Sequence, residues 1–424
     1  MAFFRRAFAA LPVQLQRPIV RAMKRRRQDT RLQSVATLTQ QALGDLRPMR
    51  TIADPALPPR IMLVIDSIVP EQLMGGAGTA LLLAVSLARA RNCGICIVTR
   101  QQRHDLPALH ALLDLQGSAF DGPIEVRHFQ GASGDAPVPL GPQDLVVTTS
   151  WWSTWSARHA IPLEQIVYLL QEDERMFYPG GDQQLLCAEV LDDTRLRYVV
   201  NTELLLTHFR ESATAGPAAN GIAFEPAFPA SIYYPIEHGG RRNLFFYARP
   251  NHPRNLFLRG IATLEHAFAE GLFPVEEWDV HFFGIDVPRI DIAGRPIHYH
   301  DTVPWADYAQ LVRTADLGLS LMYTPHPSYP PLDLAASGAV VVTNRFGPKG
   351  RRNDYCDNIL YAPLSIDGLL DALRTGVERV RDTETRRAAF DRATLGRDWA
   401  ASFAPVVAAL ADVARPGTRP GAPS

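Results

Sequence analysis

The chain has 424 residues, which is long for one ordinary domain and fits two domains of typical size. Hydrophobic residues make up 46% of it and charged residues 21%, a balance that excludes a disordered or fibrous protein. The formal net charge of −1 gives no general attraction to nucleic acid, and no run of about 18 apolar residues is present to cross a bilayer.

Residues 1–59 are predicted to be a basic leader ahead of the folded core. Arginine and lysine crowd residues 1–31, where Asp29 is the only acid and phenylalanine and leucine are interleaved. The segment lacks the unbroken apolar stretch of a secretory signal. It fits either attachment to anionic lipid headgroups or a solvated leader. Four cysteines make no disulfide framework, so we expect a cytoplasmic protein, free or peripheral on the inner face of the cell membrane.

Residues 60–240 are predicted to form an N-terminal α/β domain on the acceptor side of the protein. Five continuous apolar runs are typical of parallel strands buried on both faces. They lie at residues 60–66, 95–99, 144–149, 165–170 and 198–201. A helix is expected over 79–91, and strand continues to alternate with helix, which predicts a doubly wound parallel sheet.

A second α/β domain is predicted at residues 241–397, after a break rich in proline and glycine. Its expected strands lie at 243–248, 278–283, 316–322 and 339–343, and its expected helices at 255–270, 306–314 and 332–337. Residues 398–415 are predicted to form a helix that packs back on the first domain. Ligands of such sheets bind beyond the carboxyl ends of the strands, so we expect a cleft between the domains to hold the active site.

A basic loop, YARPNHPRN, follows the first strand of the second domain. Arg249 is expected at the carboxyl end of that strand, in a loop that leads to a helix N-terminus. A guanidinium there suits a diphosphate leaving group, because it neutralises the charge that grows as the sugar bond breaks. Arg254, in the same loop, is a second candidate for contact with the donor. The alternative for Arg249 is a surface salt bridge.

The segment 320–338 joins a buried strand to a helix through a loop stiffened by proline. Asp333 is expected in the first helical turn, where it can accept hydrogen bonds from ribose hydroxyls. Tyr329, held extended by the proline that follows it, is expected to cover the base or ribose. His326 and Ser328 are further donor-binding candidates. The alternative for Asp333 is a pairing with the helix dipole.

Two features of the first domain point into the same cleft. Gly75 and Gly76 open a helix and expose backbone to a ligand, but Leu81 stands where a dinucleotide fingerprint needs its third glycine. Glu172 lies just after a predicted strand and is the candidate for acceptor contacts or general-base work. No strict Asp-x-Asp occurs in the chain, so no metal is expected.

Five stretches together resemble glycosyltransferase family 4, and within it the WsaF-like rhamnosyltransferases of bacterial surface-glycan assembly. In chain order they are MLVIDSIVPEQLMGGAGTAL, YLLQEDERMFYPGGDQQLLCAEV, YVVNTELLL, FFYARPNHPRNLFLRG and LGLSLMYTPHPSYPPLDLAASGAVVVTN. The resemblance extends over most of residues 60–400, and the last two stretches are its most specific parts.

The resemblance implies a GT-B fold, in which two Rossmann-like domains face a cleft. It also implies retaining, metal-independent transfer of a sugar from a dTDP-linked donor to a glycan or lipid-linked glycan. In the named relatives the donor is dTDP-L-rhamnose. Carried over by position, Arg249 holds the phosphates, Tyr329 and Asp333 hold the nucleoside, and Glu172 faces the sugars.

Two positions depart from the family and leave other functions open. Of two glutamates with seven residues between them, the first is Pro325 here and the second is Asp333. A lysine of the relatives is replaced by Thr302, which leaves His300 as the nearest basic candidate for a phosphate contact. A non-catalytic homologue that binds a nucleotide sugar or glycan is therefore one alternative. An NAD-dependent oxidoreductase is the other, although the defective glycine fingerprint counts against it.

Overall fold

The computed structural model describes residues 34, 35, 38, 43, 46–70, 73, 75–101, 105–129, 136–301, 303–351, 354–411 and 413. The predictions for residues 1–31 and for Thr302 lie outside the described residues. The chain divides into two units, residues 1–46 and residues 47–424, and the fold given below is that of the second unit.

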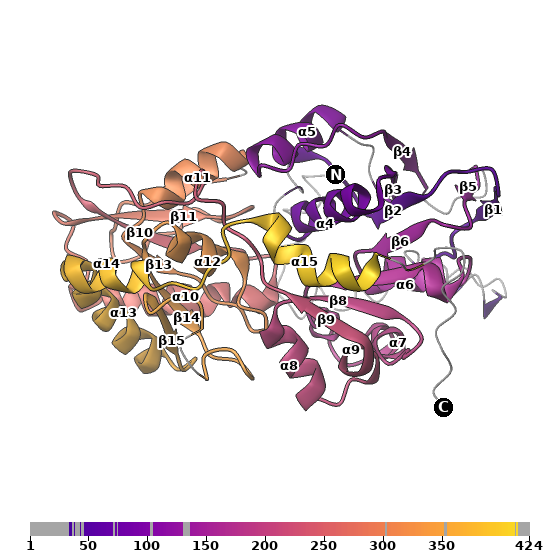
Figure 1. The fold of residues 1–424 in the computed structure, drawn as a ribbon. Helices are drawn as coiled ribbons and strands as arrows, with labels where there is room; N and C mark the ends of the chain where they lie inside the picture. The colour runs from indigo at the N-terminus through magenta and orange to yellow at the C-terminus, as the bar shows by residue number, and fades with distance from the viewer. Residues whose placement is uncertain are drawn as a thin grey trace, which may run out of the picture. The chain divides into compact units, whose positions relative to one another are not determined.

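The first sheet is fully parallel, with the strand order β4-β3-β2-β6-β7-β8-β9 (Figure 1). Its strands are β2 (Arg60–Ile65), β3 (Gly94–Thr99), β4 (Ile124–His128), β6 (Leu145–Thr148), β7 (Ile166–Leu170), β8 (Arg197–Asn201) and β9 (Gly221–Phe224). The central strands β2, β6 and β7 are buried at every residue. This burial explains why their sequences are continuous apolar runs instead of alternating ones.

The connecting helices are α4 (Gly76–Arg91), α5 (Leu106–Leu115), α6 (Trp151–Arg158), α7 (Asp182–Leu191), α8 (Glu203–Glu211) and α9 (Ala215–Asn220). Local capping sets where several of them begin. The Asp105 side chain accepts from the backbone N–H of Ala108 at the start of α5, and Ser150 and Ser153 form a capping box at the start of α6. Helix α4 is buried along most of its length because it packs directly on the sheet.

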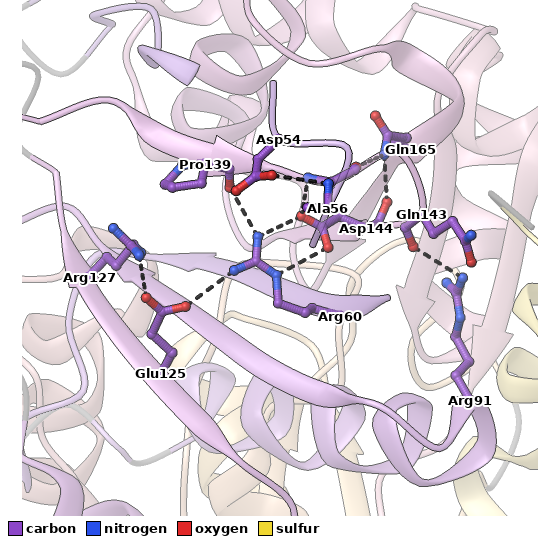
Figure 2. Close-up of polar contacts among 11 residues, drawn as sticks. Asp54, Ala56, Arg60, Arg91, Glu125, Arg127, Pro139, Gln143, Asp144 and Gln165 are labelled. Atoms are coloured by element: carbon purple, nitrogen blue, oxygen red, sulfur yellow. Dashed lines mark hydrogen bonds and ion pairs between the residues drawn. The ribbon is translucent and has the colours of Figure 1, made fainter. Parts of the chain in front are cut away.

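A buried ion pair joins the strands of the first domain at their amino ends (Figure 2). Arg60, the first residue of β2, donates through Nε and Nη2 to both carboxylate oxygens of Asp144, at 3.2 and 2.7 Å. Its Nη2 also donates to the carbonyl of Pro139 in β5 (Val138–Leu140), which pairs with β1 (Thr51–Ala53). Glu125 of β4 lies on the other side of the guanidinium, at 3.2 Å from Nη1. This network holds together the end of the sheet at which its strands begin, opposite their carboxyl ends.

The second sheet is also fully parallel, with the order β12-β11-β10-β13-β14-β15. Its strands are β10 (Arg242–Tyr247), β11 (Trp278–Phe283), β12 (His298–His300), β13 (Leu317–Leu319), β14 (Val340–Asn344) and β15 (Ile359–Ala362). Its helices are α10 (Phe257–Ala269), α11 (Trp305–Arg313), α12 (Tyr329–Ala336), α13 (Ile366–Arg381) and α14 (Thr383–Asp391). The prediction of two doubly wound parallel sheets is confirmed.

The last described helix, α15 (Trp399–Leu410), packs against α4 and β9 of the first domain (Figure 1). Phe403 is fully buried there, with its ring 4.9 Å from the ring of Phe224. The predicted return of the C-terminal helix to the first domain is therefore confirmed.

The segment after β13 differs from its prediction. The strand ends at Leu319 instead of continuing to residue 322, and α12 begins at Tyr329 instead of residue 332. Tyr329 is therefore helical and not extended, because the two prolines after it fit the first turn of a helix. As a consequence, Asp333 lies beyond the first turn, so the prediction that it stands in the first turn was wrong, and the alternative of a pairing with the helix dipole is not supported either.

Candidate functional site

A cavity of about 550 Å³ lies where the carboxyl ends of strands from both sheets meet. The second domain contributes the loops after β10 and β11, the end of β12 and the start of α12, and the first domain contributes the start of α4. The polar and aromatic residues of its lining include Thr79, Tyr247, Arg249, His300, Trp305, Tyr308, Ser328, Tyr329 and Asp333. Because ligands of parallel sheets bind at this edge, the cavity is the candidate functional site.

Two glycines shape the cavity wall. Gly284 follows β11, and a Cβ atom there would lie 1.5 Å from the carbonyl oxygen of Ala248, so only glycine lets these two loops approach. Gly75 precedes α4 with φ at +58°, a left-handed conformation that favours glycine. Gly76 does not line the cavity, and its carbonyl accepts from Nε2 of Gln171 at 2.8 Å.

Arg249 is half-buried in the cavity wall, two residues beyond the end of β10. Its Nη1 donates to the hydroxyl of Tyr247 (3.1 Å), and its Nη2 donates to Nε2 of His252 (2.8 Å). Burial, together with Arg249 itself and Arg254, lowers the pKa of His252, which keeps that ring neutral. Within the described ranges no carboxylate pairs with Arg249, so its charge is available to an anionic ligand.

Asp333 is buried on α12 at the cavity lining. The Tyr308 hydroxyl donates to its Oδ2 at 3.0 Å, and Tyr233 donates to the same carboxyl. Burial raises the pKa of Asp333 from 3.8 to about 7, although both hydrogen bonds oppose that rise. The carboxyl therefore sits close to half-protonation at neutral pH instead of being a fixed anion.

Tyr329 joins the two domains at the cavity. Its ring lines the cavity from the start of α12, while its hydroxyl accepts from Nδ2 of Asn201 (2.9 Å) and hydrogen-bonds to the Thr79 hydroxyl. Asn201 ends β8 and Thr79 lies in the first turn of α4, so both partners belong to the first domain. The ring is thus presented to the cavity with its polar end already bonded.

His300 ends β12 and lines the cavity, where its ring stacks on Phe283 at 4.4 Å. Its Nε2 lies 3.0 Å from Nδ1 of His281. Burial and the neighbouring His298 lower the pKa of His300, and burial also lowers the pKa of His281 to about 4. His300 can therefore offer a hydrogen bond at neutral pH but not a positive charge.

A buried polar cluster adjoins the cavity and joins the domains at a second place. Glu172 follows β7, and its Oε2 accepts from Nη1 of Arg254 at 2.9 Å, while its Oε1 accepts from the hydroxyl of Thr324. The ammonium of Lys349 donates to the carbonyl of Met322 at 2.8 Å and lies close enough to Glu172 to stabilise its charge. Burial raises the pKa of Glu172, and the opposing effects of Arg254, Thr324 and Lys349 do not cancel that rise.

His326 lies in the same cluster and is buried. Its Nδ1 accepts from the backbone N–H of Ser328 at 2.9 Å, and its Nε2 has no partner among the described residues. Burial, with Lys349 and Arg254 nearby, lowers the pKa of His326 to about 3, so the ring is neutral. It positions Ser328, which lines the cavity at φ +71°.

The other acids after β7 stabilise the first domain. Burial raises the pKa of Asp173, but hydrogen bonds from His208 and Arg175 outweigh it and bring the pKa to about 2. Glu174 accepts from the backbone N–H of Trp151 at 2.7 Å, and burial raises its pKa to about 8. Of the three adjacent acids, only Glu172 bonds to the second domain.

Apart from Gly76, which lies off the cavity, the predicted site residues fall into two groups. Gly75, Arg249, His300, Ser328, Tyr329 and Asp333 line the cavity, and Glu172, Arg254 and His326 belong to the buried cluster beside it. Sequence reasoning missed Tyr308, Tyr233, Thr324 and Lys349. The one available signal was that Lys349 is one of only two lysines in a chain whose basic residues are otherwise all arginine.

Two features are absent from the described residues. No group of three or more histidine, cysteine, aspartate or glutamate side chains there could hold a metal ion. No described helix combines the length and the apolar character needed to cross a membrane.

Comparison with known sequences finds similarity to a family profile and to a bacterial relative. Residues 242–374 match the family profile described as WsaF, C-terminal domain. The O-antigen biosynthesis protein RfbC of Myxococcus xanthus is 29% identical over 296 residues, which is 65% of this chain. The matched region is only 22% of that relative, so the chain spans about a fifth of its length.

Comparison with solved structures identifies the fold. The HepE protein of Anabaena in complex with UDP and glucose has a TM-score of 0.57 at 14% identity and covers 83% of this chain and 99% of its own. WaaG, a glycosyltransferase involved in lipopolysaccharide biosynthesis, has a TM-score of 0.53 at 16% identity, with 84% and 100% covered. Sucrose-phosphate synthase from Thermosynechococcus elongatus has a TM-score of 0.56 at 12% identity, with 83% and 99% covered. The chain therefore has the GT-B fold, with two Rossmann-like domains, and its second domain is similar to the C-terminal domain of WsaF.

Proposed function

We propose that the protein is a glycosyltransferase that moves a sugar from a nucleotide donor to a growing bacterial surface glycan. The observation that carries the proposal is Arg249, a guanidinium without a carboxylate partner among the described residues, in the wall of a cavity between two GT-B domains. The match to the WsaF C-terminal domain and the similarity to an O-antigen biosynthesis protein support the choice of surface glycan.

The proposed donor is dTDP-L-rhamnose, and we propose a task for the cavity residues at each part of it. Arg249 binds the diphosphate and stabilises the negative charge that develops as the bond to the sugar breaks. Tyr329 presents its ring to the nucleoside, and Asp333 bonds to the 3′-hydroxyl, the free hydroxyl of the deoxyribose. The support for rhamnose and for thymidine is the resemblance of the sequence to WsaF-like rhamnosyltransferases. UDP in the related HepE structure makes a uridine donor the alternative.

The proposed reaction retains the anomeric configuration and needs no metal ion. Arg249 lies where it can neutralise the leaving diphosphate, a task that a divalent cation performs in other transferases. Glu172 projects from the first domain toward the second, next to the cavity, and is proposed to face the sugars.

The proposed acceptor is a glycan or a lipid-linked glycan, and the protein is proposed to work in the cytoplasm. The basic residues 1–31 are proposed to hold it at the inner face of the cell membrane by attraction to anionic headgroups, an interaction of about 1 kcal/mol for each basic side chain near the surface.

A thermal-shift panel of dTDP, UDP, GDP and NAD, each with and without EDTA, tests the proposal. We expect dTDP to stabilise the protein by about 2.7 kcal/mol at 100 times its dissociation constant, with no effect of EDTA. Stabilisation by NAD alone would favour an oxidoreductase, and loss of the dTDP effect in EDTA would contradict the metal-free reaction.

A transfer assay then separates an enzyme from a homologue that only binds. Incubation with dTDP-L-rhamnose and a lipid-linked glycan acceptor should release dTDP and lengthen the acceptor by one sugar. Binding of dTDP without any transfer to a range of acceptors would instead identify a non-catalytic binding protein, for which the departure at Pro325 gives a reason.

A further inference from the structure

A chain of hydrogen bonds behind the cavity wall begins at a backbone carbonyl and ends at His300. Nδ2 of Asn243, in β10, donates at 2.9 Å to the carbonyl of Thr314, which follows α11. Oδ1 of Asn243 lies 3.1 Å from Nε2 of His281 in β11. Nδ1 of His281 in turn lies 3.0 Å from Nε2 of His300 in β12. The chain therefore crosses three neighbouring strands of the second sheet.

The carbonyl at its start fixes the proton positions along this chain. A carbonyl oxygen only accepts, so Asn243 must direct Nδ2 toward Thr314 and Oδ1 toward His281. His281 then donates from Nε2, and because burial lowers its pKa to about 4, its Nδ1 is a bare acceptor at neutral pH. His300 must therefore donate from Nε2. Burial lowers the pKa of His300 as well, so its single ring proton is used in this bond and Nδ1 carries a lone pair.

The lone pair of His300 lies on the side of the cavity. In the register of the sheet His300 is opposite Phe283, and His281 is two residues earlier, away from the carboxyl ends of the strands. The ring edge that carries Nε2 faces His281, so the opposite edge, which carries Nδ1, faces the carboxyl ends, where His300 lines the cavity. Nδ1 has no hydrogen-bond partner among the described residues.

A fixed acceptor in the wall selects the ligand group beside it. The oxygens of a diphosphate also accept, so they are poor partners for Nδ1 of His300. The donors of a nucleotide sugar are its hydroxyls and, where the base is thymine or uracil, the ring N3–H. Cytosine has a lone pair at that ring position, which would face the lone pair of His300 without a proton between them.

The cavity wall connects His300 to the proposed nucleoside contacts. The ring of His300 stacks on Phe283 at 4.4 Å, and Phe283 packs edge-on against Tyr308 at 6.2 Å. Tyr308 donates to Asp333 at 3.0 Å. Because Asp333 is proposed to take the 3′-hydroxyl of the deoxyribose, the donor that the nucleoside has left for His300 is N3–H of the base.

We propose that Nδ1 of His300 accepts a hydrogen bond from N3–H of the pyrimidine base, and that His281 and Asn243 hold it in the acceptor form. His300 is then a specificity-determining residue that selects thymine or uracil over cytosine, and His281 and Asn243 are positioning residues. The inference rests on the proposed function, because that function places a nucleotide donor in this cavity. It adds the group by which the base is read.

Calorimetric titration of dTDP and 5-methyl-dCDP tests the inference, since these nucleotides differ only at positions 3 and 4 of the base. The wild type should bind dTDP at least about tenfold more tightly. His300→Gln should lose this preference, because glutamine keeps a donor near the position of Nε2 but has no acceptor at that of Nδ1. His298→Gln is the matched control, since His298 is an exposed residue of the same strand outside the cavity lining, and it should bind both nucleotides as the wild type does.

His281→Phe distinguishes a fixed proton from a purely structural role. Phenylalanine keeps a ring to stack on Phe245 and His300 but removes the acceptor for Nε2 of His300. His300 is then free to carry its proton on Nδ1 and to donate it to cytosine. The affinity for 5-methyl-dCDP should therefore rise about threefold over the wild type, whereas loosened packing would weaken both nucleotides.

Four results would overturn the inference. They are equal wild-type affinities for the two nucleotides, an unchanged preference in His300→Gln, weakening of both nucleotides in His281→Phe, and a His300→Gln variant that binds dTDP normally but dTDP-L-rhamnose weakly. The last result would place Nδ1 on the transferred sugar. A wild type that binds neither dTDP nor UDP would instead contradict the proposed donor.

A second measurement needs no ligand. In protein labelled with nitrogen-15 histidine, a ring nitrogen with a lone pair and one with a proton give well-separated signals, and the spectrum of His300→Gln identifies those of His300. At neutral pH Nδ1 of His300 should be the nitrogen without a proton. In His281→Phe the two signals should move toward each other as the tautomers mix. A protonated Nδ1 in the wild type would show that the chain does not fix the acceptor form, and the inference would fail.

Discussion

Replacing Asp333 by asparagine tests whether the carboxyl on α12 is held near half-protonation. The side chain is buried, bonded to Tyr308 at 3.0 Å, and has a pKa of about 7. Asparagine keeps the shape and the capacity to accept hydrogen bonds but cannot ionise. The substitution therefore removes one titration from the folded protein and leaves the packing of α12 in place.

The sign of the effect follows from the raised pKa. In the unfolded chain an aspartate has a pKa of about 3.9, so between pH 4 and 7 the folded protein holds a proton that the unfolded chain has lost. Wild-type stability due to this group is therefore complete below pH 4 and is lost as pH rises toward the folded pKa. At 1.36 kcal/mol for each pKa unit, the wild type should lose about 2 kcal/mol between pH 5.5 and 8 that the asparagine variant keeps.

Urea unfolding of both proteins at pH 5.5 and pH 8 measures this difference. The free energy of unfolding of Asp333→Asn, minus that of the wild type, should grow by about 2 kcal/mol over the interval, and other titrating groups cancel in the subtraction. Tyr308→Phe is the companion variant: without its hydroxyl the Asp333 pKa rises further and the loss extends to higher pH. A difference that is the same at both pH values would refute the reasoning.

Asp333→Asn also tests the proposed hydrogen bond between Asp333 and the deoxyribose of dTDP. An ionised carboxylate forms stronger hydrogen bonds than a neutral acid, worth about 1.5–3 kcal/mol. Wild-type affinity for dTDP should therefore rise as pH passes through 7, and at pH 8 Asp333→Asn should bind about ten- to hundredfold more weakly. Equal affinities at pH 8 would mean that Asp333 does not bind the nucleotide.

Three further outcomes are expected. Arg249→Ala should reduce the rate of sugar transfer by a hundred- to thousandfold, which corresponds to about 3–4 kcal/mol of lost transition-state stabilisation, and should leave thermal unfolding unchanged. The exposed control Arg259→Ala should stay active. Near-normal turnover of Arg249→Ala would remove Arg249 from the mechanism. Asp144→Ala should lower the free energy of unfolding in urea by about 3–5 kcal/mol, because it leaves the buried Arg60 guanidinium without its main partner. Glu125→Gln, on the exposed side of the same guanidinium, should lower it by less than about 1 kcal/mol. Deletion of residues 1–31 should abolish sedimentation with anionic vesicles while activity on a water-soluble acceptor persists; unchanged sedimentation would favour a solvated leader.

The fold was predictable because parallel strands buried on both faces leave a strong local signal. The runs that became β2 and β7 are apolar at almost every residue, and each is followed by a helix. Edge strands carry a weaker signal, since β4 has only exposed and half-buried residues and β12 is only three residues long. These strands join the sheets by pairing with distant neighbours, which short-range patterns do not encode.

At the start of α12, a generally valid rule about the residue before a proline gave a wrong prediction. Proline excludes helix for the residue before it in most settings, and that rule made Tyr329 extended. Proline is also favoured in the first helical turn, where no N–H partner is lost, and this second rule prevailed. Tyr329 still lines the cavity, because either conformation places it near the carboxyl ends of the strands, and its contact with the nucleoside stays a prediction.

In the candidate site, too, some residues are recognisable from local sequence, whereas their partners come from distant parts of the chain. Arg249 is recognisable because it follows β10 closely in sequence, and Asp333 because it lies on the helix to which the loop after β13 leads; parallel sheets bring such strand ends together. The partners that set the chemistry of the buried acids come from elsewhere: the hydroxyl on Asp333 belongs to α11, and the guanidinium bound to Glu172 is that of Arg254 in the other domain. No spacing rule links residues 172 and 254, since only the meeting of two domains makes them neighbours. A sequence can therefore indicate which groups face the ligand, while the charge that each group carries depends on contacts that appear only when the chain is folded.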